Sequence, residues 1–164
     1  MKIVLSPLTN SEAIRRLCER SGEWEAMRAD GEPLIDGVPW SLVTMNPRRS
    51  AWLGVWSDSR LVGAFLFINL GDGIAEVHTL MTRECRGKAA VQAGKEALLW
   101  VFHHRVFLDE SPDEIITNCP EPNRAASYYA AAVGLNYQGR HPMAWVKHGK
   151  AHDLLQWGIH KFEL

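Results

Sequence analysis

Hydrophobic and polar positions follow two periods along this chain, and the changes between them predict a mixed order of strands and helices. Residues 3–5 form a short apolar run, and the polar cluster at 9–11 offers side-chain oxygens to cap a helix that follows. Ile14, Leu17 and Cys18 then recur at three- and four-residue spacing among charged side chains. The N-terminus is therefore expected to be a strand followed by an amphipathic helix.

Three strands are predicted in the middle of the chain. The β-rich runs 52–56 and 61–70 are separated by a polar tetrad, which is typical of a hairpin. A Gly-Asp-Gly turn precedes a third run, 74–82, in which alternation places Glu76 and His78 on one face. These three strands should form an antiparallel meander.

The second half of the chain alternates between helical and extended patterns. A long run without proline, 88–107, is rich in small residues that let a helix lie close to a sheet. A short β-branched strand is expected at 114–118, a helix at 123–133, and a hairpin from 137–148 and 152–160. The predicted fold class is α/β, with a mixed, mostly antiparallel central sheet and flanking helices, because the long helix carries the chain to a parallel neighbour.

The segment from Trp24 to Arg49 has a looser pattern, with several glycines and prolines and interspersed large aromatics. It is expected to be a loop with a short helix. A long irregular stretch of this kind either lines a binding site or only covers the sheet, and the sequence leaves both interpretations open.

Composition indicates an ordinary globular protein. Of 164 residues, 46% are hydrophobic and 23% charged, so residues 1–164 are expected to form a single domain rather than a disordered chain or a disulfide scaffold. Eighteen basic and 19 acidic residues give a net charge of -1, so no global field favours binding to nucleic acid or to an anionic membrane. No apolar stretch approaches about 18 residues, so the protein is expected in the cytoplasm.

The three cysteines, Cys18, Cys85 and Cys119, are widely spaced and form no C-x-x-C pair. Structural zinc and a disulfide framework are therefore not expected, and no metal site is predicted. Cys119 is expected to be a small buried residue rather than a nucleophile.

The turn between the strand 74–82 and the long helix has the chemistry of an anion site. It contains Arg86, Gly87 and Lys88, and the unpaired amide groups at a helix N-terminus favour negative charge. The turn lacks the spacing of a P-loop or a dinucleotide fold, which disfavours nucleotide hydrolysis and hydride transfer. An ordinary connection with solvated basic side chains is the alternative.

The order of elements and two local motifs resemble the GNAT superfamily of acyl-CoA-dependent N-acyltransferases. That family's phosphate turn reads [QR]-x-x-G-x-[GA], and residues 84–89 read Glu-Cys-Arg-Gly-Lys-Ala, with Glu84 at the first position. Residues 123–135 are similar to the later family motif, with Asn123, Ala126 and Gly134 at the expected offsets. The stretch 76–80 resembles bacteriophage-encoded members.

The resemblance implies that the strands 74–82 and 114–119 splay apart to receive the pantetheine arm of acetyl-CoA, the expected co-substrate. The pyrophosphate would then lie on the turn before the long helix. The contact residues that this implies are Leu80, Met81, Thr82, Arg86, Gly87, Lys88, Ala89 and Asn123. Asn123 is open to a second interpretation, as the N-cap of its helix.

Acyl transfer to an amine needs a base, and the central strand offers Glu76 and His78 as candidate catalytic residues. His titrates near neutrality without help, whereas the family often uses a strand carboxylate, which favours Glu76. The alternative is that both side chains only line a wet cleft or hydrogen-bond to each other. Many family members also use a tyrosine seven residues after the Asn, where this chain has Ala130. Tyr129 and Tyr128 precede it by one and two places on the helix and are expected to point into packing rather than toward the sulfur.

The resulting hypothesis is an N-acetyltransferase that moves an acetyl or short acyl group from acyl-CoA to a primary amine by direct attack. The alternative is a catalytically inactive GNAT-like fold that serves as a phage assembly or protein-binding module. The acceptor amine, a small molecule or a protein, is not identified, and its pocket is expected between the segment 24–49 and the hairpin 139–152. The candidate acceptor residues are Trp24, Trp40, Arg48 and Arg49. The strand 152–160 is predicted as an edge strand through which a homodimer could form.

Overall fold

The fold is described from a computed structural model, at residues 2–22, 29–31, 34–35, 38–39, 46, 48–107 and 110–164. Nine strands are labelled among these residues: β1 (Val4–Pro7), β2 (Leu34–Ile35), β3 (Val38–Pro39), β4 (Ser50–Ser57), β5 (Arg60–Gly71), β6 (Ile74–Met81), β7 (Glu114–Pro120), β8 (Asn136–Lys147) and β9 (Lys150–His160). The helices are α1 (Ser11–Ser21), α4 (Lys88–His103), α5 (Arg124–Val133) and the short 3-10 helix η1 (Lys161–Glu163).

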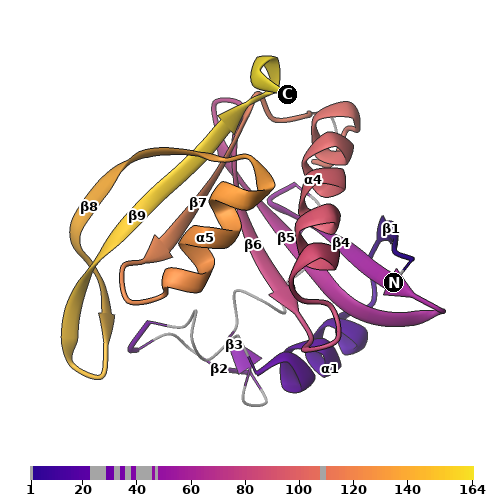
Figure 1. Ribbon diagram of the computed structural model, residues 1–164, viewed down its shortest axis with the longest axis horizontal. Coiled ribbons are helices and arrows are strands. Elements are labelled where there is room, and N and C mark those ends of the chain that lie inside the picture. Colours follow the sequence, from indigo (N-terminus) through magenta and orange to yellow (C-terminus); the bar gives the residue numbers. More distant parts are fainter. Residues whose placement is uncertain are drawn as a thin grey trace.

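Seven strands form one sheet in the order β1-β4-β5-β6-β7-β9-β8 (Figure 1). The pairing of β6 with β7 is parallel, and the other pairings in this sheet are antiparallel. Helix α4 carries the chain from β6 to β7, as a parallel neighbour requires. The predicted mixed, mostly antiparallel sheet with flanking helices is confirmed.

Helices pack on both faces of the sheet, because successive residues of the central strands point to opposite sides. Phe65 and Phe67 of β5 belong to the core beneath α4 and α5, which lie together over one face in Figure 1. Leu66 and Leu80 belong to a second core with Ile14 of α1. The polar cluster before α1 acts as expected, since Asn10 caps the helix by accepting the Ala13 N–H.

Helix α4 ends earlier than its sequence pattern predicts. It stops at His103, and Phe107 instead forms an isolated bridge with Glu110. The His104 ring stacks on Trp100 at 4.8 Å, and its Nδ1 lies 2.6 Å from the Trp100 carbonyl oxygen. The His104 ring therefore pairs with a carbonyl group in the last turn of the helix. The backbone of His104 has extended φ and ψ, so the helix does not continue.

The prediction that residues 152–160 form an edge strand is wrong. Strand β9 lies between β7 and β8, so the edges of the seven-stranded sheet are β1 and β8. The hairpin folds back so that β9 pairs with β7 from Glu114↔His160 to Pro120↔Leu154, which buries Ile159. The more polar strand β8, which is mostly exposed, takes the outer position.

The irregular segment of the chain docks on the C-terminal hairpin. The Asp30 N–H donates to the Val146 carbonyl at 2.8 Å, and the Gly149 N–H donates to Asp30 Oδ2 at 2.7 Å. Backbone donors from Gly149 and His148 also lower the pKa of the Asp30 carboxyl. The strands β2 and β3 pair as a small hairpin within this segment, and the short helix predicted there falls outside the described residues.

Within the described part of the chain, no helix is both long and apolar enough to cross a membrane.

Candidate active site

The two parallel strands of the sheet part after three paired positions. The register runs from Ile74↔Glu114 to Glu76↔Ile116, while β6 continues to Met81 and β7 to Pro120. The splayed pair that the sequence predicts is therefore confirmed. Parallel strands that stop pairing leave backbone polar groups that need other partners, which makes the gap suited to a polar chain molecule.

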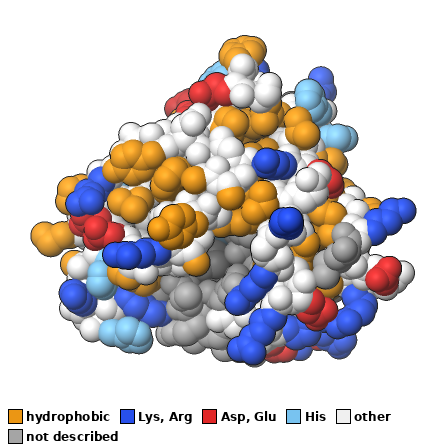
Figure 2. Space-filling view, viewed as in Figure 1, with side chains coloured by type: hydrophobic (Ala, Val, Ile, Leu, Met, Phe, Trp, Pro, Cys, Tyr) orange, Lys and Arg blue, Asp and Glu red, His pale blue; other side chains and the backbone are white. Residues whose placement is uncertain are grey.

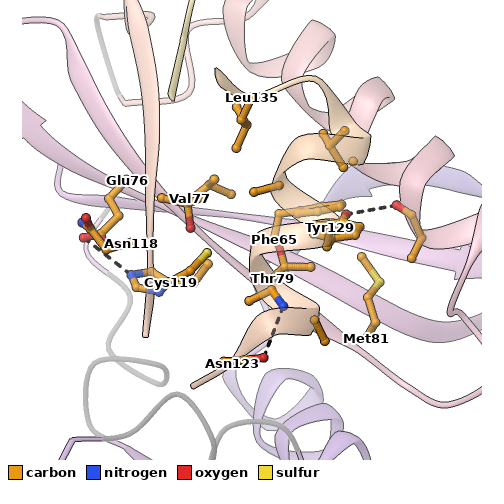
Figure 3. A pocket seen from close by; sticks show the side chains of 18 of the residues that line it. Phe65, Glu76, Val77, Thr79, Met81, Asn118, Cys119, Asn123, Tyr129 and Leu135 are labelled. Atoms are coloured by element: carbon orange, nitrogen blue, oxygen red, sulfur yellow. Dashed lines mark hydrogen bonds and ion pairs between the residues drawn. The ribbon is translucent and has the colours of Figure 1, made fainter. Parts of the chain in front are cut away.

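A cavity of about 530 Å³ occupies this gap. Glu76 and His78 line it from one face of the sheet, and Val77 and Thr79 line it from the other. Because neighbouring residues of a strand point to opposite faces, the cavity passes between the strands from one side of the sheet to the other. Figure 3 shows Glu76 and Asn118 together on one side of it and Tyr129 and Met81 on the opposite side.

The backbone of β6 presents only alternate residues to the gap. The Thr82 N–H and its hydroxyl both donate to the Val62 carbonyl, at 3.0 and 2.9 Å, so Thr82 faces β5. Alternation turns the backbone groups of Leu80 the same way, and its side chain is fully buried under α1. Val77, Thr79 and Met81 therefore face the gap, which corrects the expectation that Leu80 and Thr82 pair with a ligand there.

The start of α4 borders the cavity. Arg86 and Gly87 line it, and Lys88 and Ala89 are the first two residues of the helix. No side chain caps this helix, and Gly87 has φ 62° and ψ -130°, a conformation that glycine alone adopts readily. A Cβ on Gly87 would meet no atom within 4 Å, so the backbone is open to a ligand. Figure 2 shows Lys and Arg side chains around this part of the surface.

Three polar side chains meet where the strands part. Asn118 Nδ2 donates to Glu76 Oε1 at 3.0 Å, and Glu76 Oε2 lies 3.8 Å from His78 Nε2. The side chains of Glu76 and His78 are 19% and 28% exposed, so both are half-buried within reach of a ligand. The shared face of Glu76 and His78 follows from alternation, but Asn118 was not anticipated; its signal was a polar residue near the end of an apolar strand.

Asn123 begins the helix on the far side of the cavity. Its side-chain oxygen accepts the Ala126 N–H at 3.2 Å, so it caps α5, as one of its two interpretations proposed. Asn123 also lines the cavity, which leaves its expected place beside a pantetheine arm intact as a prediction.

The sequence matches no protein-family model and no curated protein. Solved structures, in contrast, share its whole architecture. A chimera of spermidine N-acetyltransferase SpeG from Vibrio cholerae and hSSAT aligns with a TM-score of 0.76 at 16% identity, over 99% of this chain and 98% of the chimera. A probable acetyltransferase of the GNAT family from Chromobacterium violaceum aligns with a TM-score of 0.73 at 19% identity, over 99% and 85% of the two chains. This chain has the GNAT fold.

The one acidic departure from the GNAT turn pattern, Glu84, forms an ion pair within the fold. Glu84 stands where the pattern has Gln or Arg, and its carboxylate lies 3.1 Å from the Arg60 guanidinium. Glu84 is not among the described residues that line the cavity. The negative charge is therefore partly neutralised and directed to the end of the β4-β5 hairpin rather than to the start of α4.

The two tyrosines of α5 differ in their contact with the cavity. Tyr129 lines the cavity, but its hydroxyl donates to the Ala90 carbonyl of α4 at 3.0 Å. Ala130 is buried, as packing requires, and Tyr128 is 75% exposed, which contradicts the expectation that it packs inside. Among the described residues, no tyrosine hydroxyl is therefore left aimed at the cavity as an obvious proton donor.

Cys119 lines the cavity as a buried thiol. Burial raises its pKa to about 11, so the neutral thiol dominates at physiological pH. This agrees with the expectation of a buried small residue rather than a nucleophile.

The expected acceptor side is described in part. Trp145, within the predicted hairpin segment 139–152, lines the cavity together with Leu154. Arg48 and Arg49 are exposed at the start of β4 and do not belong to the cavity lining. Trp24 and Trp40 lie outside the described residues.

Proposed function

We propose that this chain transfers an acetyl or another short acyl group from acyl-CoA to a primary amine, by direct attack in a ternary complex. The observation that carries the proposal is a continuous cavity that is lined both by Arg86 and Gly87 before α4 and by Glu76, at the gap between β6 and β7. A long ligand with an anionic end and a reactive end fits such a passage.

Acyl-CoA fits the residues at both ends of the cavity. The first amide groups of α4, with Arg86 and Lys88, would hold the pyrophosphate, since a helix N-terminus and basic side chains both favour anions. The backbone of Val77 and Thr79 would pair with the amides of the pantetheine arm. When bound, the co-substrate supplies an activated thioester carbonyl.

Glu76 is proposed as the base. The acceptor amine loses a proton to Glu76 Oε2, directly or through a water molecule, and His78 beside that oxygen is the second candidate. The amine nitrogen then forms the new amide bond while the bond between acyl carbon and sulfur breaks. The sulfur leaves with a proton as free CoA, so one proton is released for each protonated amine consumed.

Direct attack is favoured over a covalent acyl-enzyme. The thiol of Cys119 is the one cysteine among the described cavity residues, and its pKa of about 11 keeps it protonated. A neutral, buried thiol is a poor nucleophile.

The proposal is tested first by binding. Acetyl-CoA at 100-fold excess over its Kd should stabilise the fold by about 2.7 kcal/mol, which raises Tm by roughly 5 to 10 °C for a chain of this size. No shift at millimolar acetyl-CoA would overturn it. A mass-spectrometric screen with labelled acetyl-CoA would then identify the amine, and spermidine belongs in it because similar structures are spermidine N-acetyltransferases.

A catalytically inactive binding module is the second candidate. Glu84 in the phosphate turn, alanine at position 130 and the engaged hydroxyl of Tyr129 favour it. It predicts acetyl-CoA binding without acetylation of any amine in the screen, or no binding. A homodimer, a bacteriophage origin and a cytoplasmic location remain predictions.

A further inference from the structure

Asn118 connects the two strands at the point where they part. The last paired position is Glu76↔Ile116, so Asn118 lies two residues further along β7, on the same face as Glu76. Its side chain reaches back across the widening gap to Glu76 Oε1 at 3.0 Å. Figure 3 shows the two side chains beside each other at the edge of the cavity.

The chemistry of this contact fixes the orientation of the Asn118 amide. An ionised carboxylate only accepts hydrogen bonds, so the amide NH₂ must face Glu76 and the oxygen must point elsewhere. Asn118 Oδ1 is buried, and none of the described residues donates a hydrogen bond to it. A buried acceptor without a partner is unfavourable by about 1–3 kcal/mol, which makes a ligand donor there valuable.

We propose that Asn118 is a positioning residue with two tasks, and this proposal rests on the function proposed above. Its NH₂ group fixes the Glu76 carboxylate so that Oε2, the oxygen beside His78, is the one left to take a proton. Its Oδ1 receives an N–H of the acceptor amine. The amine is thereby held between Asn118 Oδ1 and Glu76 Oε2, with one N–H on each.

This arrangement favours a primary amine, whose protonated form has more than two N–H groups. A protonated primary amine has three N–H donors, so it can satisfy Asn118, give a proton to Glu76 and keep one further contact. The lone pair left behind takes the direction of the lost N–H bond, so the amine turns about its C–N bond to direct the lone pair at the thioester carbonyl, and one of its two remaining N–H groups keeps the Asn118 contact. A tertiary amine cannot do this, because its single N–H cannot serve both oxygens.

A binding experiment tests the receiving oxygen without requiring an identified substrate. Methylammonium, the smallest primary ammonium ion, is titrated into ¹⁵N-labelled protein while the amide peaks of residues 76–79 are followed by NMR. In Asn118→Leu its Kd should rise at least about tenfold, the loss of one hydrogen bond to a charged group. Asn118→Asp keeps an oxygen at the same place and should bind at least as tightly as wild type.

The matched control is Gln138→Leu. Gln138 Nε2 donates to Glu114 Oε1 at 2.6 Å, an amide–carboxylate contact to the same strand outside the cavity. This variant should leave the methylammonium Kd unchanged. The inference is overturned if wild type shows no saturable response, or if Asn118→Leu binds within twofold of wild type.

Turnover tests the positioning task with the amine found in the screen. Asn118→Leu should lower kcat by about 10- to 100-fold with the KM for acetyl-CoA unchanged, and should add less than about twofold in a Glu76→Gln background. In Asn118→Asp a second carboxylate beside Glu76 should move the acidic limb of the pH–rate profile to higher pH. If Asn118→Leu lowered kcat as strongly in the Glu76→Gln background as in wild type, the positioning role of Asn118 would be wrong. If acetyl-CoA does not bind, the proposed function fails while the methylammonium result still decides the role of Asn118.

Discussion

Gly94 of α4 lies directly against Tyr129 of α5: a Cβ on Gly94 would stand 2.5 Å from the Tyr129 hydroxyl oxygen and 2.6 Å from Val133 Cγ2. The absence of a side chain lets the two helices approach, and the hydroxyl then reaches the Ala90 carbonyl. Gly94 and Tyr129 both line the cavity, and the hydrogen bond directs the Tyr129 proton to the Ala90 carbonyl.

Tyr129→Phe is expected to affect stability more than catalysis. Loss of the hydrogen bond to Ala90 removes about 0.5–1.5 kcal/mol, which lowers Tm by roughly 1 to 6 °C for a chain of this length. The value of kcat should change by less than about twofold, since the hydroxyl proton is already engaged. Thermal melts and steady-state rates measure the two effects. A large fall in kcat at unchanged Tm would identify Tyr129 as the acid that protonates the leaving sulfur.

Glu76→Gln should lower turnover at pH 7 by about 10²- to 10⁴-fold, because the amide cannot accept the proton of the amine. Binding of acetyl-CoA should change little, since Glu76 lies near the start of β6 and the strand runs on to Met81 before the chain reaches the start of α4. The rate of thiol release, followed with a colour reagent, measures the loss. Glu114→Gln is the control, because Gln138 contacts that carboxylate in the same way outside the cavity. Unchanged rates in Glu76→Gln would assign the base to His78 or to water.

Gly87→Ala is expected to weaken acetyl-CoA binding beyond its effect on stability. With φ 62° and ψ -130°, the position strains any other residue by about 1–3 kcal/mol, and a Cβ would stand where the proposed phosphate would approach the backbone. Gly149→Ala likewise places a side chain at positive φ, 70°, in the β8-β9 turn, outside the cavity lining. Both variants should lose stability in thermal melts, and only Gly87→Ala should lose affinity by calorimetry. Equal affinities of the two variants for acetyl-CoA would show that the phosphates do not bind at this turn.

Charge at the turn gives a prediction with the opposite sign. Glu84→Gln removes a carboxylate near the proposed phosphate site and should tighten acetyl-CoA binding about two- to fivefold at low salt, whereas Arg60→Ala leaves Glu84 without this ion pair and should weaken binding. Added salt should shrink both differences, since exposed charges are screened. Calorimetric titrations at two salt concentrations measure this. Identical affinities in all three proteins would mean that the phosphates lie elsewhere.

The buried cysteines predict a loss of stability at high pH. Burial raises the pKa of Cys18 and of Cys119 from 9.0 to about 11, so the folded state keeps protons that the unfolded state releases. Stability from each thiol is therefore complete below pH 9 and falls by about 1.4 kcal/mol per pH unit between pH 9 and 11. Urea unfolding across this range measures the slope, which Cys119→Ala should make shallower by about 1.4 kcal/mol per pH unit, the contribution of one thiol. An unchanged slope would show that the thiol of Cys119 ionises as easily folded as unfolded.

Several features of the site follow from local sequence. Alternation along β6 places Glu76 and His78 on one face, and glycine at position 87 marks a turn that needs positive φ before a helix. The helical spacing of Ile14 and Leu17 identifies the buried stripe of α1. Each of these depends on the geometry of a single element, which residues a few positions apart determine.

Other features depended on which elements meet. The interior position of β9 and the contact of Asn118 with Glu76 join residues that no local period relates. The sequence by itself determined the elements and their exposed chemistry. Only the tertiary structure decided where β6 and β7 stop pairing and which side chain bridges them, because strand pairing and packing are long-range interactions whose balance is settled when the whole sheet assembles.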